Sequence, residues 1–284
     1  MKLVATVALG LALVAGAADL PPVSFAPIAI GSEVFDARFG HIQGGCCTED
    51  AIYLTQMKCL YKFDWSGKLL KKKLVISHTG DICFWQGEIY TSVSVREGPN
   101  KGKGGMIQVF DQDLNLVRET LLDRGTDGIT ILDGVLYLGM GSNHKPSSEP
   151  HLENWVGFFD PKTLKPLRDR KTIDFGVKTH FGVQGISSDG KDVFCAFYTA
   201  EKGKPSLVAF DKDMKTVRAA SAYHASQGFD RLPARFGGEH PRFFRSITHK
   251  LPKDKADPKA PRKLSATIEF FEWRDGKAVD ITKR

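Results

Sequence analysis

An aromatic residue followed by an acidic residue recurs five times along the chain, and this repeat limits the fold more than any other feature. The pairs are separated by 47, 49, 51 and 61 residues, and they are Phe63-Asp64, Phe110-Asp111, Phe159-Asp160, Phe210-Asp211 and Phe271-Glu272. Each pair ends a run in which apolar and polar residues alternate and precedes a polar turn, which is the pattern of a β-hairpin. We therefore interpret the acids as turn residues whose carboxylates accept backbone N–H groups across the hairpin.

A second pattern lies upstream of every hairpin. A short polar or glycine-containing segment leads into an apolar strand, a turn and a further strand, and its copies begin at Gln43-Gly44-Gly45, Gly80-Asp81-Ile82, Asp127-Gly128-Ile129, Gln184-Gly185-Ile186 and Gln227-Gly228-Phe229. With a fourth strand after each aromatic–acidic pair, every repeat has four antiparallel strands, and no segment shows convincing helical periodicity. The pattern predicts an all-β fold, a five-bladed β-propeller of four-stranded antiparallel blades.

The five repeats also set the approximate limits of the blades, which are residues 41–76, 77–122, 123–173, 174–222 and 223–284. The last fourth strand nearly reaches the end of the sequence, so each blade could be complete from its own repeat, and residues 23–39 could pair on the final blade to close the ring. A β-sandwich with long insertions is the alternative architecture. Five copies of one pattern in the same register favour the propeller.

The first 17 residues have the composition of a secretory signal peptide. Lys2 supplies a positive charge, residues 3–14 are apolar, and Ala15-Gly16-Ala17 is a small-residue cleavage site. We expect residues 18–284 to form a single propeller domain that is secreted or periplasmic and has no membrane span after cleavage; a membrane anchor is the alternative. Hydrophobic residues make up 42% and charged residues 26% of the 284 residues, a globular composition that argues against disorder and against a polytopic membrane protein.

The Gly-Ile blade starts and the aromatic–Asp turns resemble those of secreted propellers of the broad YVTN and NHL-like kind. The starts at Gln43, Gln184 and Gln227 also resemble, more weakly, those of the plant-type glutaminyl cyclotransferases. The second resemblance implies a five-bladed propeller and an enzyme that forms pyroglutamate at the N-terminus of a peptide. The third start, Asp127-Gly128, departs from that family, in which Glu-Gly is expected.

The candidate site residues are polar side chains near the starts of the first strands. In a propeller the first strand of each blade lines the axis, so these starts lie together on one face, and they bring together His41, Gln43, His78, Asp81, Asp127, His180, Gln184, His224 and Gln227. Such groups can bind a ligand or exchange protons, and they could instead only hydrate a central tunnel. We expect Asp81 and Asp127 at the centre of the site, where they could bind a divalent cation on the axis; no other cofactor is indicated.

The loops between second and third strands add basic residues to the same face. Residues 250–263 contain six basic and two acidic residues in a chain of net charge +7, and further basic or histidine side chains occur at Lys101, Lys103, His144, Lys145, His151, Lys202 and Lys204. A basic face attracts anionic ligands. Trp155 begins a third strand on this face and could stack on a sugar ring, although core packing also explains it.

Several common signatures are absent from the sequence. No complete nucleotide-binding loop, no Gly-x-Ser-x-Gly and no His-Glu-x-x-His motif occurs, and nothing indicates a nucleic-acid partner. The cysteines are odd in number and most lie in apolar runs, so we interpret them as small buried apolar side chains: Cys46, Cys47, Cys59, Cys83 and Cys195. A disulfide from Cys46 or Cys47 to Cys83 is the alternative.

Together these features predict an exported monomer that recognises a carbohydrate or another anionic ligand, either a small molecule or a peptide, on its basic, His-rich face. Two alternatives stay open, because a fold does not determine a function. One is an enzyme, either glutaminyl cyclotransferase-like or polysaccharide-cleaving. The other is an interaction scaffold without a small-molecule site.

Overall fold

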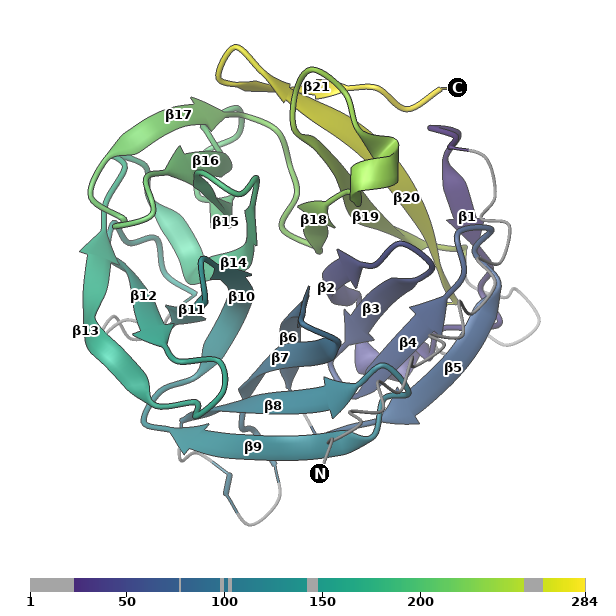
Figure 1. Ribbon diagram of the computed structural model, residues 1–284, viewed down its shortest axis with the longest axis horizontal. Coiled ribbons are helices and arrows are strands. Elements are labelled where there is room, and N and C mark those ends of the chain that lie inside the picture. Colours follow the sequence, from purple (N-terminus) through teal and green to yellow (C-terminus); the bar gives the residue numbers. More distant parts are fainter. Residues whose placement is uncertain are drawn as a thin grey trace, which may run out of the picture.

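The alternating segments form five antiparallel sheets that stand around a common axis (Figure 1). The computed structural model describes residues 23–76, 78–97, 100–101, 104–141, 148–252 and 263–283. The five-bladed β-propeller expected from the repeats is confirmed. Within the described ranges no helix has the length and apolarity to cross a bilayer. Residues 1–17, where we expect the signal peptide, lie outside these ranges.

In each of the first four blades, sequence order is also spatial order from the axis to the rim (Figure 1). Blade 1 comprises β2 (Ile42–Cys47), β3 (Ile52–Gln56), β4 (Cys59–Phe63) and β5 (Leu69–Leu74). Blade 2 comprises β6 (Thr79–Trp85), β7 (Glu88–Ser94), β8 (Gly105–Asp111) and β9 (Leu116–Leu122). Blade 3 comprises β10 (Thr126–Leu132), β11 (Val135–Met140), β12 (Asn154–Phe159) and β13 (Pro166–Ile173). Blade 4 comprises β14 (Thr179–Ser188), β15 (Val193–Thr199), β16 (Leu207–Phe210) and β17 (Val217–Ser221).

The fifth blade closes the ring with segments from both ends of the chain. Its inner strands are β18 (Phe229–Arg231), β19 (Arg242–Lys250) and β20 (Leu264–Arg274). The outer edge of β20 is shared by two strands, because β21 (Lys277–Asp280) pairs with its C-terminal part and β1 (Ile28–Ile30) pairs with its N-terminal part. The segment 23–39 therefore does pair on the final blade, through β1.

The acids of the aromatic–acidic pairs have the structural role that the sequence predicts. Asp111 Oδ1 accepts the backbone N–H groups of Asn115 at 2.8 Å and of Asp113 at 2.9 Å, and the pKa of Asp111 is lowered, first of all by the hydrogen bond from Asn115. The equivalent acids in blades 1, 3 and 4 accept backbone N–H groups in the same way. In the fifth pair, Glu272 instead forms ion pairs with two arginines.

Aromatic side chains fill the junction between blade 1 and the closing blade. Phe236 lies in the 3₁₀ turn η2 (Ala234–Phe236) and is 3% exposed; a second 3₁₀ turn, η1 (Ala37–Phe39), precedes β2. The Phe236 ring centroid is 4.6 Å from that of Trp65 and 6.2 Å from that of Phe25. Because Trp65 belongs to the outer hairpin of blade 1 and Phe25 precedes β1, this cluster joins the two ends of the ring.

Replacing Phe236 with alanine should therefore lower the free energy of unfolding by about 3–5 kcal/mol, the usual cost of truncating a buried aromatic side chain. Urea denaturation measures the change. The control is Leu167→Ala, on the outer strand β13 at a position 51% exposed, which should cost less than about 1 kcal/mol. If both variants had equally small effects, the Phe236 cluster would not be what holds the ring closed.

All five cysteines are buried thiols without a disulfide. This confirms their interpretation as small apolar side chains, and the alternative link from Cys46 or Cys47 to Cys83 is not formed. Burial raises the pKa of Cys46 and of Cys83 well above the usual value, so these thiols stay protonated and unreactive near neutral pH.

Candidate functional site

The five blades approach one another closely at the axis, and in blades 1, 3 and 5 one position has almost no room for a side chain. The equivalent positions, one per blade, are Gly44, Asp81, Gly128, Gly185 and Gly228. A Cβ atom on Gly44 would lie 2.4 Å from Cα of Asp81, and one on Gly228 would lie 2.4 Å from the carbonyl carbon of Gly44. Blades 1 and 5 therefore require glycine here, whereas blade 2 places the side chain of Asp81 at the axis.

Asp81 links neighbouring blades at the axis. The residue is 0% exposed, and its Oδ2 accepts the backbone N–H of Ile186 in blade 4 at 2.9 Å and of Ile129 in blade 3 at 3.2 Å. Burial raises the pKa of Asp81 well above its usual value, although these hydrogen bonds oppose the shift. We expected Asp81 and Asp127 to meet a ligand together, but one oxygen of Asp81 is engaged by two backbone amides and only Asp127 reaches the face.

Bulges next to these axial positions leave the preceding residues outside the strand ladder. The pairing of first and second strands skips residues in blades 1 to 4, between Ile42 and Gly44, Thr79 and Ile82, Thr126 and Ile129, and Val183 and Gly185. A bulge bends a strand and can redirect a side chain. Gln43, Asp127 and Gln184 occupy the bulges of their blades, near the ends where the first strands begin.

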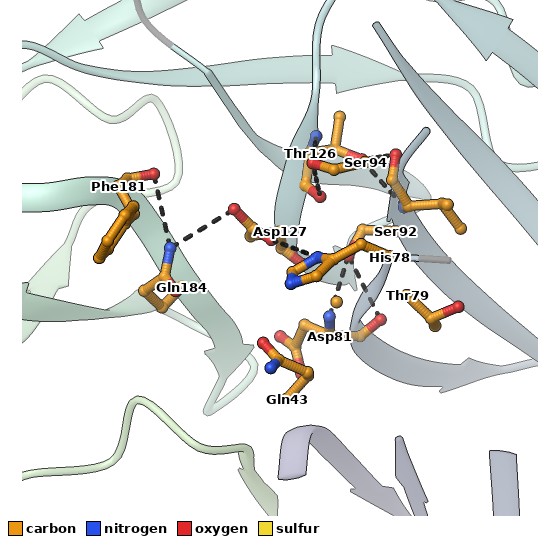
Figure 2. Close-up of polar contacts among 12 residues, drawn as sticks. Gln43, His78, Thr79, Asp81, Ser92, Ser94, Thr126, Asp127, Phe181 and Gln184 are labelled. Atoms are coloured by element: carbon orange, nitrogen blue, oxygen red, sulfur yellow. Dashed lines mark hydrogen bonds and ion pairs between the residues drawn. The ribbon is translucent and has the colours of Figure 1, made fainter. Parts of the chain in front are cut away.

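Asp127 is the centre of the polar cluster on this face (Figure 2). Its Oδ1 lies 3.9 Å from Nδ1 of His78, and its Oδ2 accepts a hydrogen bond from Nε2 of Gln184 at 3.5 Å. Gln184 Nε2 also lies 3.5 Å from the carbonyl oxygen of Phe181. The Asp127 side chain is 22% exposed and that of His78 is 11% exposed, so the cluster is recessed and still open to solvent.

The protein surroundings shift the pKa values of both Asp127 and His78. Burial raises the pKa of Asp127 to about 6, while the nearby Arg96 and the Gln184 hydrogen bond act in the opposite direction. Burial, followed by the charge of Arg96, lowers the pKa of His78 to about 4. At neutral pH the cluster therefore holds a carboxylate next to a neutral imidazole.

These two groups leave part of their hydrogen-bonding capacity unused. His78 Nδ1 is buried and has no hydrogen-bond partner within the described part of the chain. The 3.9 Å separation from Asp127 is too long for a direct hydrogen bond. A hydroxyl group fits the requirement, because it can donate a hydrogen bond to the carboxylate while accepting a hydrogen bond from the Nδ1–H tautomer of His78.

A second group of side chains on the same face comes from blades 1, 4 and 5. His41 Nε2 lies 3.3 Å from the Tyr198 hydroxyl and 3.3 Å from Nε2 of Gln43. His224 Nε2 lies 3.3 Å from Ser226 Oγ, and its ring centroid is 6.0 Å from that of Tyr198. Of the expected site residues, His41, Gln43 and His224 thus gather around Tyr198, while His78, Asp127 and Gln184 form the cluster described above.

Three expected site residues have other environments. His180 Nδ1 lies 2.7 Å from the carbonyl oxygen of Ser148, and the Gln227 side chain accepts the backbone N–H of Thr248 at 3.0 Å. Trp155 is only 4% exposed, and the guanidinium carbons of Arg124 and Arg170 lie 4.6 and 4.1 Å from its ring centroid. Trp155 is therefore a core residue covered by cations, and its ring is not available to stack on a sugar.

Sequence reasoning missed three residues of this face: Arg96, Phe181 and Tyr198. Tyr198 is near the end of β15 and Arg96 follows β7, and second strands end on the face where first strands begin, so the topology could have identified both. Phe181 reads as an ordinary apolar strand residue. It is 45% exposed because the register of β14 shifts between His180 and Val183.

The described residues contain no group of three or more His, Cys, Asp or Glu side chains arranged to hold a metal ion. The cation site at Asp81 and Asp127 stays a prediction. Lys103, His144 and Lys145, and most of the basic segment 250–263, lie outside the described ranges. Lys101, Lys202 and Lys204 are exposed.

The raised pKa of Asp127 predicts how stability depends on pH. Because folding raises this pKa from 3.8 to about 6, the folded chain retains a proton that the unfolded chain loses across that range, so the contribution of Asp127 to stability falls as the pH rises. Asp127→Asn should therefore gain stability relative to the wild type, from about 0.5 kcal/mol at pH 4 to about 3 kcal/mol at pH 7.

Urea denaturation at several pH values measures this difference between the variant and the wild type. Using the difference matters because the lowered pKa of His78 acts in the opposite direction, favouring the folded state as the pH rises from about 4 to 6.5. Asp169→Asn, on the exposed strand β13, is the control and should show no such trend. If the difference in free energy of unfolding between Asp127→Asn and the wild type did not change with pH, folding would not alter the pKa of Asp127.

Comparisons with known proteins support the fold. No model of a protein family matches the chain, and no curated protein sequence matches it. A glutaminyl cyclase of Myxococcus xanthus is structurally similar, with a TM-score of 0.56 and 9% identity over 89% of this chain and 95% of that one. A luciferin-regenerating enzyme is less similar, with a TM-score of 0.45 and 10% identity over 80% of this chain and 76% of that one. The Pan2 WD40 domain of Neurospora crassa has a TM-score of 0.45 and 10% identity over 85% of this chain and 77% of that one. At such low identity the likeness shows the propeller fold alone.

Proposed function

We propose that the protein binds a carbohydrate, preferably one with an acidic substituent, on the face where the first strands begin. The observation that carries this proposal is the gap between His78 Nδ1 and Asp127 Oδ1, which needs a group able to donate and accept hydrogen bonds. A water molecule could also fill that gap. Sugar hydroxyls satisfy the same requirement, and the amide of Gln184 lies beside Asp127 to bind a neighbouring hydroxyl.

The preference for an acidic substituent rests on Arg96. Its charge influences both Asp127 and His78, so it lies close to the cluster, and no hydrogen bond or ion pair engages its guanidinium among the described residues. Asp127 itself is negative at neutral pH and would repel an anion. The sugar ring is therefore placed over Asp127 and its acidic group near Arg96, where a guanidinium can bind a carboxylate or sulfate.

Binding to an array of neutral and uronate-containing or sulfated glycans tests this function. We expect retention of a subset of glycans, with acidic members favoured over their neutral counterparts, and confirmation by titration calorimetry. An array on which no glycan is retained above background, in buffer of low ionic strength, would contradict the proposal.

An enzyme is the second candidate, because a carboxyl group with a pKa of about 6 can transfer protons near neutral pH. The fold similarity to a glutaminyl cyclase agrees with this candidate without identifying a reaction. Polysaccharide cleavage by paired carboxylates is less favoured, since Asp81 is engaged at the axis. Release of ammonia from a peptide with N-terminal glutamine, and release of reducing ends from a bound glycan, distinguish turnover from binding.

We further propose that the protein acts as a monomer in a secreted or periplasmic location. The support is the signal-peptide pattern of Lys2, the apolar residues 3–14 and Ala15-Gly16-Ala17. N-terminal sequencing of the protein from its native source should begin at Ala18 or Asp19. Recovery of an intact N-terminus from a cytoplasmic fraction would contradict export.

A further inference from the structure

Phe181 combines two unfavourable properties on the proposed binding face. Its φ angle is +64°, in the left-handed region that a bulky side chain rarely adopts, and the residue is 45% exposed. The following residue, Gly182, also has a positive φ, of +87°, so the chain makes a left-handed step here inside β14. A strained backbone that holds an aromatic ring in solvent does not favour folding, and such strain is common where a ligand is bound.

The neighbours of Phe181 extend its ring into an aromatic surface. The Tyr198 ring lies 6.4 Å away at an interplanar angle of 84°, and the His180 ring lies 6.2 Å away. Beyond Tyr198, the His41 and His224 side chains continue the surface through the contacts described above. Segments from blades 1, 4 and 5 thus provide a set of rings with hydrogen-bonding atoms at their edges.

This surface differs in charge from the Asp127 cluster. Burial, and then the charge of Lys250, lowers the pKa of His41, and burial and then Arg245 lower that of His224. Both imidazoles are therefore neutral at neutral pH. Aromatic rings with neutral hydrogen-bonding edges suit the apolar face of a sugar ring and its hydroxyl groups.

Gln184 connects the two parts of the face. Its Nε2 lies 3.5 Å from Asp127 Oδ2 and 3.5 Å from the carbonyl oxygen of Phe181, so the carboxylate and the strained backbone share one amide (Figure 2). Only the side chain of Gln184 therefore separates the Asp127 carboxylate from the residue at which the aromatic surface begins.

We infer that Phe181, Tyr198, His41 and His224 form a second sugar subsite beside the Asp127 subsite, so that the ligand is an oligosaccharide of at least two units. This inference rests on the proposed function. One unit hydrogen-bonds to Asp127, His78 and Gln184, and the adjacent unit stacks on Phe181.

The test compares Phe181→Gly with the wild type by titration calorimetry against galacturonate, digalacturonate, glucose and cellobiose. For the wild type we expect at least one dimer to bind roughly tenfold or more tightly than its monomer. The variant should bind that dimer no more tightly than the monomer, with monomer affinity unchanged within about twofold. Its melting temperature should be unchanged or raised, because glycine adopts a positive φ without strain. Leu167→Ala is the control for removing an exposed apolar side chain and should bind like the wild type.

The possible failures are distinguishable. Equal affinity of the wild type for monomers and dimers, an equal loss for both in Phe181→Gly, or a lowered melting temperature of that variant overturns the second subsite and leaves the proposed function standing. Absence of wild-type binding to all four sugars overturns the second subsite, and the proposed function is contradicted with it only if the glycan array also retains nothing.

Discussion

Replacing Asp81 with alanine should lower the free energy of unfolding by about 3 kcal/mol or more. The substitution leaves the buried N–H groups of Ile129 and Ile186 without their acceptor, and each unsatisfied buried donor costs about 1–3 kcal/mol. It also opens a space at the axis where Gly44 and its neighbours pack. Urea denaturation gives the magnitude.

Asp81→Asn is the matched variant, because its side-chain carbonyl can still accept both N–H groups. It should stay within about 1 kcal/mol of the wild type and keep its affinity for glycans. If Asp81→Ala were as stable as the wild type, or if Asp81→Asn abolished binding, Asp81 would belong to the ligand site and its structural role at the axis would be wrong.

Replacing Asp127 with asparagine should weaken glycan binding on the order of 100-fold while leaving the fold intact. Hydrogen bonds to a charged group contribute about 1.5–3 kcal/mol each, and the carboxylate can accept two from a sugar. Titration calorimetry with a glycan retained on the array measures the loss. Together with its gain in stability at neutral pH, this loss would mark Asp127 as a residue retained for function.

Asp169→Asn removes the same charge from an exposed position on β13 and controls for the change in net charge. It should bind like the wild type. Equal affinities for wild type and Asp127→Asn would remove Asp127 from the binding site and favour the scaffold alternative.

The arrangement of strands could be predicted because it depends on local patterns that the five repeats present several times. The acid of each of the first four pairs, such as Asp111, binds backbone N–H groups two to four residues further along the chain, so its role is visible within a few residues. The pairing of β1 on the last blade could only be suggested, since it joins segments more than 200 residues apart in sequence.

The candidate site was less predictable because it depends on register. We expected Asp81 and Asp127 to act together because both lie at blade starts, but the repeat places Asp81 level with Gly128, one residue further along than Asp127. Asp81 therefore occupies the axial position that is glycine in the other blades. A shift of one residue in a strand turns a side chain to the opposite side. The exposure of Phe181 could not be predicted for the same reason. It follows from a register shift in β14, and no residue type in that strand indicates such a shift.

The most direct measurement of the central claim is the side-chain ¹⁵N NMR spectrum of the histidines, recorded while the tightest-binding array glycan is added. His78 is assigned by its absence from the spectrum of His78→Gln, and His240, which lies in the segment between β18 and β19, is the internal control. If a sugar hydroxyl enters the gap beside Asp127, the Nδ1 resonance of His78 should move with the same saturation curve as the calorimetric titration, and His240 should not move. Saturated binding with an unchanged His78 resonance would place the ligand elsewhere and contradict the proposed site.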